Sequence, residues 1–248
     1  MKVRVDQLLV DRGLAETHER AQALLIAGQV LVNGQKSEKP GIQIDVNSKI
    51  ELLARMPYVS RGGFKLAGAL DHFSIDVAGL KCIDVGSSTG GFTDCLLQRG
   101  AVSVCAIDVG KGQLDWRLRT DPRVEVREGV NARALSPTDF PHRFDLAVCD
   151  ASFISVTMLI PAFVPLLEEH GEMVLLVKPQ FEVAREDVGP GGIVRDPTLH
   201  HAACDRVRVC VEQLGFSATI IESPILGAEG NREFLLYATR ATRTTEPR

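Results

Sequence analysis

The chain has 248 residues, of which 45% are hydrophobic and 24% are charged, the proportions of a globular protein. Its apolar runs fall well short of the ~20 residues that a membrane-spanning helix needs, and charges interrupt the first apolar stretch, so we expect neither a membrane span nor a signal peptide. The six cysteines include no Cys-x-x-Cys pair and the six histidines are scattered, which disfavours a disulfide framework and a metal site. We expect a cytoplasmic protein with reduced cysteines in its core.

The net charge of −4 combines two unlike parts of the chain. Residues 1–65 hold ten basic and seven acidic residues, a balance of +3, whereas the remainder has a balance of −7. An acidic protein can bind nucleic acid where its basic residues cluster. The N-terminal part is therefore the candidate nucleic-acid-binding region.

The first sixty residues have the pattern of a compact α+β module. Apolar residues after Val5 predict a short helix, and a second helix is expected near Thr17, a candidate N-cap. Gly28 is placed to end this helix, and the alternating residues that follow predict small strands with an Asn33-Gly34 turn. Two short helices followed by small strands are expected.

This module resembles the S4 RNA-binding domain of ribosomal and RNA-modifying proteins, in which the second helix and the following turn lie against RNA. The resemblance is carried by Arg4, Asp6, Leu8, Leu9, Arg20, Ala21, Leu25, Gly28, Val30, Val32, Asn33 and Gly34. It implies RNA contacts at Arg4, Arg20, Lys36 and Lys39, to which we add Arg61 near the start of the second domain. The acidic Glu19 departs from the family's Ser-Arg pattern and would weaken the contact at Arg20. The alternative is a helical cap with a solvated charged face.

Beyond residue 80, apolar runs alternate with helical stretches. The runs lie at 81–85, 101–109, 144–149, 171–177, 217–221 and 233–238. Such alternation predicts an α/β fold with a mainly parallel sheet that is covered on both faces. Ligands of these sheets bind beyond the carboxyl ends of the strands, so the residues that end the runs are candidate site residues.

A small-residue loop, D-V-G-S-S-T-G-G-F at 84–92, follows the first run. It lacks both the G-x-G-x-x-G spacing of a dinucleotide site and the Lys-Ser/Thr of a P-loop. It resembles the first motif of S-adenosylmethionine-dependent methyltransferases, where small residues let the backbone approach the cofactor. The resemblance implies an S-adenosyl-L-methionine site formed by Asp84, Gly86, Ser87, Ser88, Thr89, Gly90, Gly91, Phe92, Thr93, Asp108, Asn131 and Asp150.

Asp108 and Asn131 are expected to contact the nucleoside part of the cofactor. Asp108 ends the second run, where it could accept hydrogen bonds from ribose hydroxyls, and Asn131 lies beyond the expected third strand, on the adenine side. A ribose-binding acid also suits NAD, so the glycine spacing is what discriminates. The single tryptophan, Trp116, is expected to pack near the cofactor side or against a helix.

The acceptor of the methyl group is indicated by a set of four residues, one of which, Asp150, is also an expected cofactor residue. No Asn/Asp-Pro-Pro-Tyr/Phe motif follows the fourth run, which disfavours methylation of a base amine, and Cys149 is assigned to the core rather than to nucleophilic catalysis. Lys65, Asp150, Lys178 and Glu233 resemble the Lys-Asp-Lys-Glu tetrad of RrmJ/FtsJ-class ribose 2′-O-methyltransferases.

The tetrad suits the chemistry because a ribose hydroxyl is a poor nucleophile that must lose its proton as the methyl carbon is attacked. Lys178 is the candidate for assisting that loss or for stabilising the developing alkoxide. Asp150 and Glu233 would orient Lys178 and Lys65, and Lys65 would also hold the acceptor nucleotide. Taken singly, each residue also fits a solvated charge, an ion-pair partner or a helix cap.

The order of these parts is that of the TlyA (hemolysin A-like) family, which the chain resembles from about residue 3 to 240, including 178–182 and the Gly/Pro-rich 188–197. The resemblance implies an S4-like domain with its linker in 1–58, a Rossmann-like FtsJ-type domain with a mainly parallel seven-stranded sheet in 59–241, and a disordered tail at 242–248.

The family resemblance also implies a function. It predicts methylation of a cytidine 2′-hydroxyl in large-subunit 23S ribosomal RNA and leaves 16S ribosomal RNA open as a second target, so that ribosomal RNA or ribosomal subunits would be the partners. The alternatives are a ribosome-binding or assembly protein with little activity, a methyltransferase for another RNA or a small molecule, and, more distantly, a haemolysin.

Overall fold

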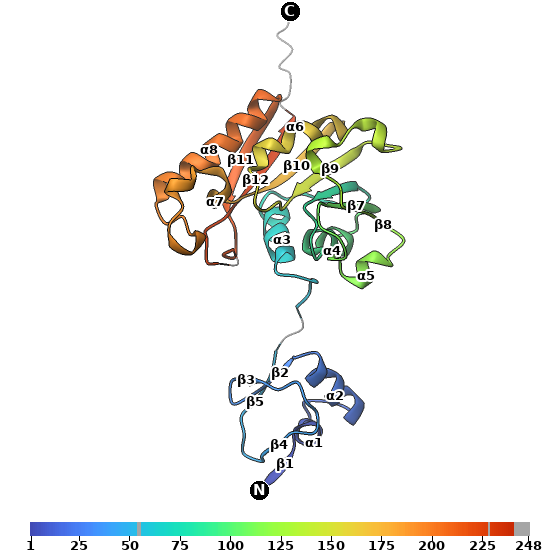
Figure 1. Ribbon diagram of the computed structural model, residues 1–248. Helices are drawn as coiled ribbons and strands as arrows, with labels where there is room; N and C mark the ends of the chain where they lie inside the picture. Colours follow the sequence, from blue (N-terminus) through green and yellow to red (C-terminus); the bar gives the residue numbers. More distant parts are fainter. Residues whose placement is uncertain (54–55, 228, 241–248) are drawn as a thin grey trace, which may run out of the picture. The chain divides into compact units, whose positions relative to one another are not determined.

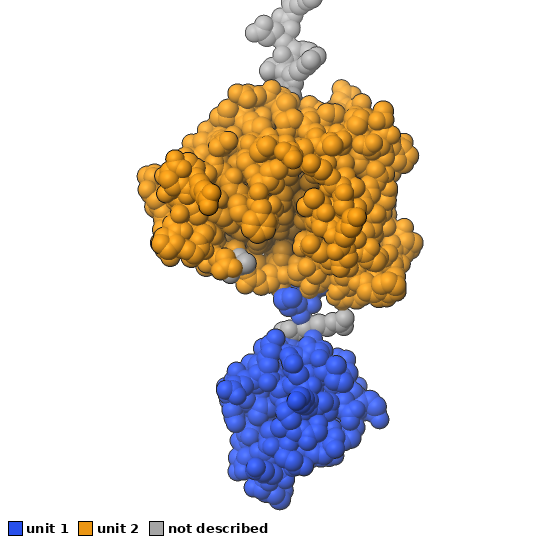
Figure 2. Space-filling model, viewed as in Figure 1, with its two compact units in different colours: residues 1–57 blue, residues 58–248 orange. Residues whose placement is uncertain are grey.

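The computed structural model describes residues 1–53, 56–227 and 229–240 (Figure 1). The chain divides into two compact units, one ending at Pro57 and one beginning at Tyr58 (Figure 2). The domain limits expected at 1–58 and 59–241 stay predictions, and the tail expected at 242–248 lies outside the described residues.

The first unit is a small α+β module with two antiparallel sheets, β1-β4 and β3-β2-β5. Its elements are β1 Lys2–Arg4, α1 Val5–Asp11, α2 His18–Ile26, β2 Val30–Val32, β3 Gln35–Lys36, β4 Gln43–Asp45 and β5 Ile50–Leu52. Thr17 caps α2 by accepting a hydrogen bond from the Arg20 amide at 3.2 Å, as its N-cap position predicts. Both helices bury apolar faces in one core, in which Leu9 and Leu25 are fully buried.

The second unit is built on a seven-stranded sheet with the order β11-β12-β10-β9-β6-β7-β8. Its strands are β6 Lys81–Val85, β7 Ser103–Asp108, β8 Val124–Glu128, β9 Phe144–Cys149, β10 Leu167–Val177, β11 Phe216–Glu222 and β12 Phe234–Arg240. The five strands from β10 to β8 pair in parallel, whereas β12 pairs antiparallel with both β10 and β11. The expected α/β fold with a mainly parallel sheet is confirmed.

Helices cover both faces of this sheet (Figure 1). They are α3 Gly62–His72, α4 Gly91–Gln98, α5 Trp116–Arg119, α6 Ile160–Phe163, α7 Pro179–Glu182 and α8 Pro197–Gln213. Because successive strand residues point to opposite faces, Ile83 packs in one core with Val207 of α8, and Cys82 packs in the other with Leu66 of α3. This double burial explains why the central strands are nearly continuous apolar runs.

All six cysteines are free, and Cys149 is fully buried, where burial raises the pKa of its thiol to about 12. The assignment of Cys149 to the core is therefore confirmed. Among the described residues, no helix combines the length and apolar character that crossing a membrane requires.

Candidate active site

Two cavities open where the parallel strands reach their carboxyl ends. The smaller has a volume of about 320 Å³ and the larger of about 550 Å³. Gly86, Ser88 and Asp150 belong to both linings, so the cavities adjoin along the loop between β6 and α4. This is the edge at which open α/β sheets bind their ligands.

The loop between β6 and α4 is shaped by glycines that no other residue could replace without displacement. Gly86 has φ 83°, and a Cβ there would lie 3.0 Å from backbone atoms of Ala151. A Cβ on Gly91 would lie 2.2 Å from Ser60 Oγ and 2.9 Å from the Gly63 amide nitrogen. The loop is therefore pressed between the segment after β9 and the start of α3, and small residues are required.

Asp84, in β6, connects this strand to the start of α4 by hydrogen bonds to Thr93. Its carboxylate is fully buried, and Oδ2 accepts hydrogen bonds from the Thr93 amide at 2.9 Å and the Thr93 hydroxyl at 2.6 Å. Burial raises the pKa of Asp84 to about 7, and Oδ1 has no hydrogen-bond partner. Asp84, Thr93 and Gly90 lie outside both cavity linings, so among the expected cofactor residues these three are placed to shape the loop.

The other expected cofactor residues border the cavities. Ser87, Thr89, Gly91 and Phe92 line the smaller one, and Asp108 and Asn131 line the larger one. Asp108 accepts hydrogen bonds from the Ser88 amide and the Gly110 amide, both at 2.7 Å. The structure thus brings the loop and the ends of β7 and β8 to one cavity.

The four residues expected to form the tetrad make two ion pairs. Lys65 Nζ on α3 lies 2.5 Å from Glu233 Oε2, just before β12. Lys178 Nζ, just after β10, lies 2.6 Å from Asp150 Oδ1, although not in a hydrogen-bonding direction. Lys65, Lys178 and Glu233 are only 7%, 8% and 3% exposed. The cost of burying these charges is therefore offset by their ion-pair partners. Lys65 and Asp150 both line the smaller cavity.

Sequence reasoning missed two residues that follow Asp150 in the larger cavity. Ser152 Oγ accepts a hydrogen bond from Lys178 Nζ at 2.7 Å. Phe153 is 92% exposed and has φ 64°, a rare conformation for a bulky residue, and its ring centroid lies 5.3 Å from that of Phe181. The signal was available, because both residues directly follow a strand-ending acid.

Glu182 at the end of α7 fixes the same segment. Its side chain is buried, and it accepts hydrogen bonds from Ser155 Oγ at 2.5 Å and from the Val156 amide at 2.7 Å. Burial raises the pKa of Glu182. The segment after β9 is therefore attached to the segment after β10 through Glu182 as well as through Lys178.

The residues expected to bind RNA lie in both units. Arg20, Lys36 and Lys39 are exposed in the first unit, and Arg4 there is held by Asp6, with its Nη2 2.6 Å from Oδ2. Arg61 is exposed in the second unit and lines the smaller cavity. Within the ranges that the structure describes, no group of three or more His, Cys, Asp or Glu side chains is arranged to hold a metal ion.

The family model of the FtsJ-like methyltransferases matches residues 58–240, and that of the S4 domain matches residues 3–50. The chain belongs to the FtsJ-like methyltransferase family. Relatives extend this result to both units. A Mycobacterium tuberculosis protein named 16S/23S rRNA (cytidine-2'-O)-methyltransferase TlyA is 45% identical over 244 residues, covering 97% of this chain and 91% of that protein. Hemolysin A of Brachyspira hyodysenteriae is 40% identical, covering 95% and 99%.

Solved structures agree with this membership. A candidate hemolysin from Streptococcus thermophilus is 43% identical to this FtsJ-like methyltransferase, covers 97% of it and 89% of its own chain, and has a TM-score of 0.75. A candidate S-adenosylmethionine-dependent methyltransferase from Listeria monocytogenes is 15% identical, covers 71% of this chain and 100% of its own, and has a TM-score of 0.53, which shows a shared fold. The resemblance to the TlyA (hemolysin A-like) family is confirmed.

Proposed function

We propose that this FtsJ-like methyltransferase transfers a methyl group from S-adenosyl-L-methionine to the 2′-hydroxyl of a cytidine in ribosomal RNA. The observation that carries the proposal is the pair of buried ion pairs, Lys65–Glu233 and Lys178–Asp150, beside the glycine loop. The 45% identity to a protein named as a ribosomal RNA cytidine 2′-O-methyltransferase supports the acceptor. Large-subunit 23S RNA is the first target to test, and 16S RNA the second.

The residues around the larger cavity fit the cofactor. Gly86, which lines both cavities, lets the loop pack closely on the backbone of Ala151, where a Cβ would lie 3.0 Å from it. Asp108 would accept hydrogen bonds from the ribose hydroxyls, and Asn131 would lie on the adenine side, since both line this cavity. The smaller cavity, which adjoins it at the loop, would then hold the reacting atoms. When bound, the cofactor supplies an activated methyl group.

Lys178, whose partners Asp150 and Ser152 line the cavities, would act on the acceptor oxygen. An ammonium group has three N–H donors, and here one is directed to Ser152 while Asp150 lies within ion-pairing distance. A remaining donor can stabilise the negative charge that develops as the hydroxyl loses its proton. The carboxylate of Asp150, whose Oδ1 lies 2.6 Å from Nζ, would orient Lys178 for this role.

Lys65 would bind the acceptor nucleotide. Its ammonium lines the smaller cavity and is fixed by Glu233, so its position does not depend on substrate. The S4 domain would supply phosphate contacts through Arg4, Arg20, Lys36 and Lys39, and Arg61 would add one beside the cavity. A cytoplasmic location, with ribosomal RNA as the partner, remains part of the proposal.

The test is methyl transfer from radiolabelled S-adenosyl-L-methionine to ribosomal subunits from cells that lack the gene, followed by digestion of the RNA to nucleosides. Label in 2′-O-methylcytidine is expected. Label on a base would refute the role of the Lys-Asp-Lys-Glu tetrad. Binding of subunits without any label would favour an assembly protein, the alternative from another functional class.

A further inference from the structure

The large aromatic side chain of Trp116 is exposed to solvent. Of the described phenylalanine, tyrosine and tryptophan side chains, the exposed ones are Phe64 at 37%, Trp116 at 72% and Phe153 at 92%. The indole has no ring or cation partner among the described residues. Exposure of a whole tryptophan ring is costly, because apolar surface of this size normally lies in a core or an interface.

The exposed rings lie on segments that border the candidate active site. The Asp115 amide, immediately before Trp116, donates a hydrogen bond at 3.1 Å to the carbonyl of Thr89, which lines the smaller cavity. Phe153 lines the larger cavity. Phe64 belongs to α3, whose first residue lines the smaller cavity. In the order β9-β6-β7, the rings after β9 and β7 therefore follow the two strands that flank β6 and its glycine loop.

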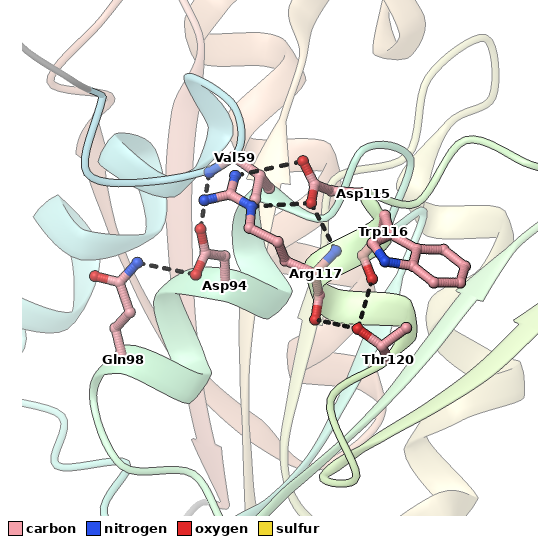
Figure 3. A network of polar contacts seen from close by, with 7 residues as sticks. All are labelled: Val59, Asp94, Gln98, Asp115, Trp116, Arg117 and Thr120. Carbon is pink, nitrogen blue, oxygen red and sulfur yellow. Dashed lines mark hydrogen bonds and ion pairs between the residues drawn. The ribbon is translucent and has the colours of Figure 1, made fainter. Parts of the chain in front are cut away.

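The turn that carries Trp116 is held firmly. Glu128 Oε1 accepts hydrogen bonds from the Gln113 amide at 3.2 Å and from Arg119 Nη2 at 2.6 Å. The carboxylate of Asp115 caps α5 through the Arg117 amide at 2.9 Å. Figure 3 shows the indole pointing away from the Asp115–Arg117 pair and from Asp94. The exposed ring is thus presented by an ordered turn, which lowers the entropic cost of binding a partner.

We propose that Trp116 stacks on an unpaired base of the substrate RNA, close to the nucleotide whose 2′-hydroxyl enters the smaller cavity. The inference rests on the proposed function, and it adds a residue of the catalytic domain that contacts the RNA outside the reacting nucleotide. An aromatic face is the usual partner of a splayed base in single-stranded RNA, and it accepts any base because every base has a π-face.

The surroundings favour RNA over a protein partner. Exposed cations border the same cavities: Arg61 lines the smaller, Arg133 lines the larger, and Lys111 follows Asp108 closely. Phosphates on either side of a stacked base would meet these charges. The residues next to Trp116 in the chain, Asp115 and Arg117, are charged, whereas the core of a protein interface is depleted of charged residues.

The sequence offers a direct measurement, because Trp116 is its only tryptophan. Indole fluorescence of the full chain would be followed while a protein-free 23S ribosomal RNA transcript is added, with excitation where nucleobases absorb little. Quenching of the emission and protection from acrylamide are expected. The same titration with Trp116→Phe measures the fluorescence that does not come from Trp116. This control is also needed when isolated large subunits replace the transcript, because their proteins contain other tryptophans.

The second measurement compares Trp116→Ala with Trp116→Phe in methyl transfer. Loss of one stacked base predicts a KM for RNA that is roughly 10-fold higher in Trp116→Ala, whereas Trp116→Phe keeps most of the affinity. The kcat and the dissociation constant of S-adenosylhomocysteine should be unchanged in both, since Trp116 lines neither cavity. Circular dichroism spectra would confirm folding, which is expected because the side chain is exposed.

Several outcomes would overturn the inference while leaving the proposed function intact. In the first, the RNA binds and is methylated, but the indole stays as accessible to acrylamide as it is in the free protein. In the second, Trp116→Ala leaves the KM for RNA unchanged. Protection by assembled subunits but not by a transcript that binds and is methylated would assign the contact to a ribosomal protein. If the wild type methylates neither transcript nor subunits, the proposed function fails, and this inference fails with it.

Discussion

Replacing Lys178 by alanine tests the proposed chemistry most directly. The substitution removes the ammonium that contacts both Asp150 and Ser152, whereas Lys178 itself lines neither cavity. A group that assists proton loss from the acceptor or stabilises its charge contributes about 10²- to 10⁴-fold in rate. That loss corresponds to about 3–5 kcal/mol in the activation barrier.

The cost of the substitution to stability is expected to be smaller. Removing one partner of a fully buried ion pair costs about 3–5 kcal/mol, because an unpaired charge stays in the interior. Here the side chain of Asp150 is 22% exposed, so water can replace part of what the ammonium supplied. A loss of about 1–3 kcal/mol is therefore expected, the cost of leaving a buried polar group without its partner.

Single-turnover methyl transfer, calorimetric binding of S-adenosylhomocysteine and urea unfolding would be measured on the same preparation. Lys81→Ala is the matched control, since Lys81 is an exposed lysine at the other end of β6. Lys178→Ala should lose at least 100-fold in rate while binding the cofactor product normally. Turnover equal to that of the control would refute the assignment, and loss of cofactor binding would show that Lys178 supports the cavity instead.

The other predictions concern the loop, its buried acid and the S4 domain. Burial raises the pKa of Asp84 from 3.8 to about 7, so the wild type should lose stability as pH rises through this range. Between about pH 4 and about pH 8, the free energy of unfolding of the wild type, measured in urea, should fall by roughly 3–4 kcal/mol, and Asp84→Asn should reduce this fall. An equal fall in the wild type and the variant would contradict the prediction. Gly91→Ala should weaken cofactor binding at least ~10-fold in calorimetry, because its Cβ would displace Ser60, whereas Gly41→Ala, with nothing within 4 Å, should not. Arg20→Glu should weaken RNA binding and lower the slope of log K against log salt by about 1 or more, and salt-independent binding by the wild type would exclude phosphate contacts.

The alternation of apolar runs predicted the parallel sheet, because strands buried on both faces are recognisable without knowledge of their neighbours. It was less informative at the edges. β8, Val-Glu-Val-Arg-Glu at 124–128, alternates because it is an edge strand, and it does not read as an apolar run. β10 begins at Leu167, ahead of the apolar run at 171–177, and its pairing with β9 shifts register between Leu167 and Glu172.

The residues of the candidate site also differ in how far the sequence alone could predict them. Asp150 and Lys178 could be proposed from the sequence because each ends a buried run, where the topology of the sheet brings strand ends together. The pairing of Lys65 with Glu233 depended on a family resemblance, since α3 lies before the first strand of the sheet. Trp116 was expected to pack near the cofactor side or against a helix, and this was wrong in one respect, because its ring is 72% exposed. Exposure depends on which neighbours the fold supplies, and a local pattern does not contain that information.

The Lys65–Glu233 contact joins residues 168 positions apart in the chain. A ribosome makes proteins from the N-terminus onward. Lys65 and the glycine loop between β6 and α4 are therefore synthesised long before Glu233, whose carboxylate pairs with this lysine. Until Glu233 has been synthesised, the Lys65–Glu233 ion pair of the candidate site cannot form. The candidate site is therefore completed only when the final strand of the sheet, β12, is being added to the chain.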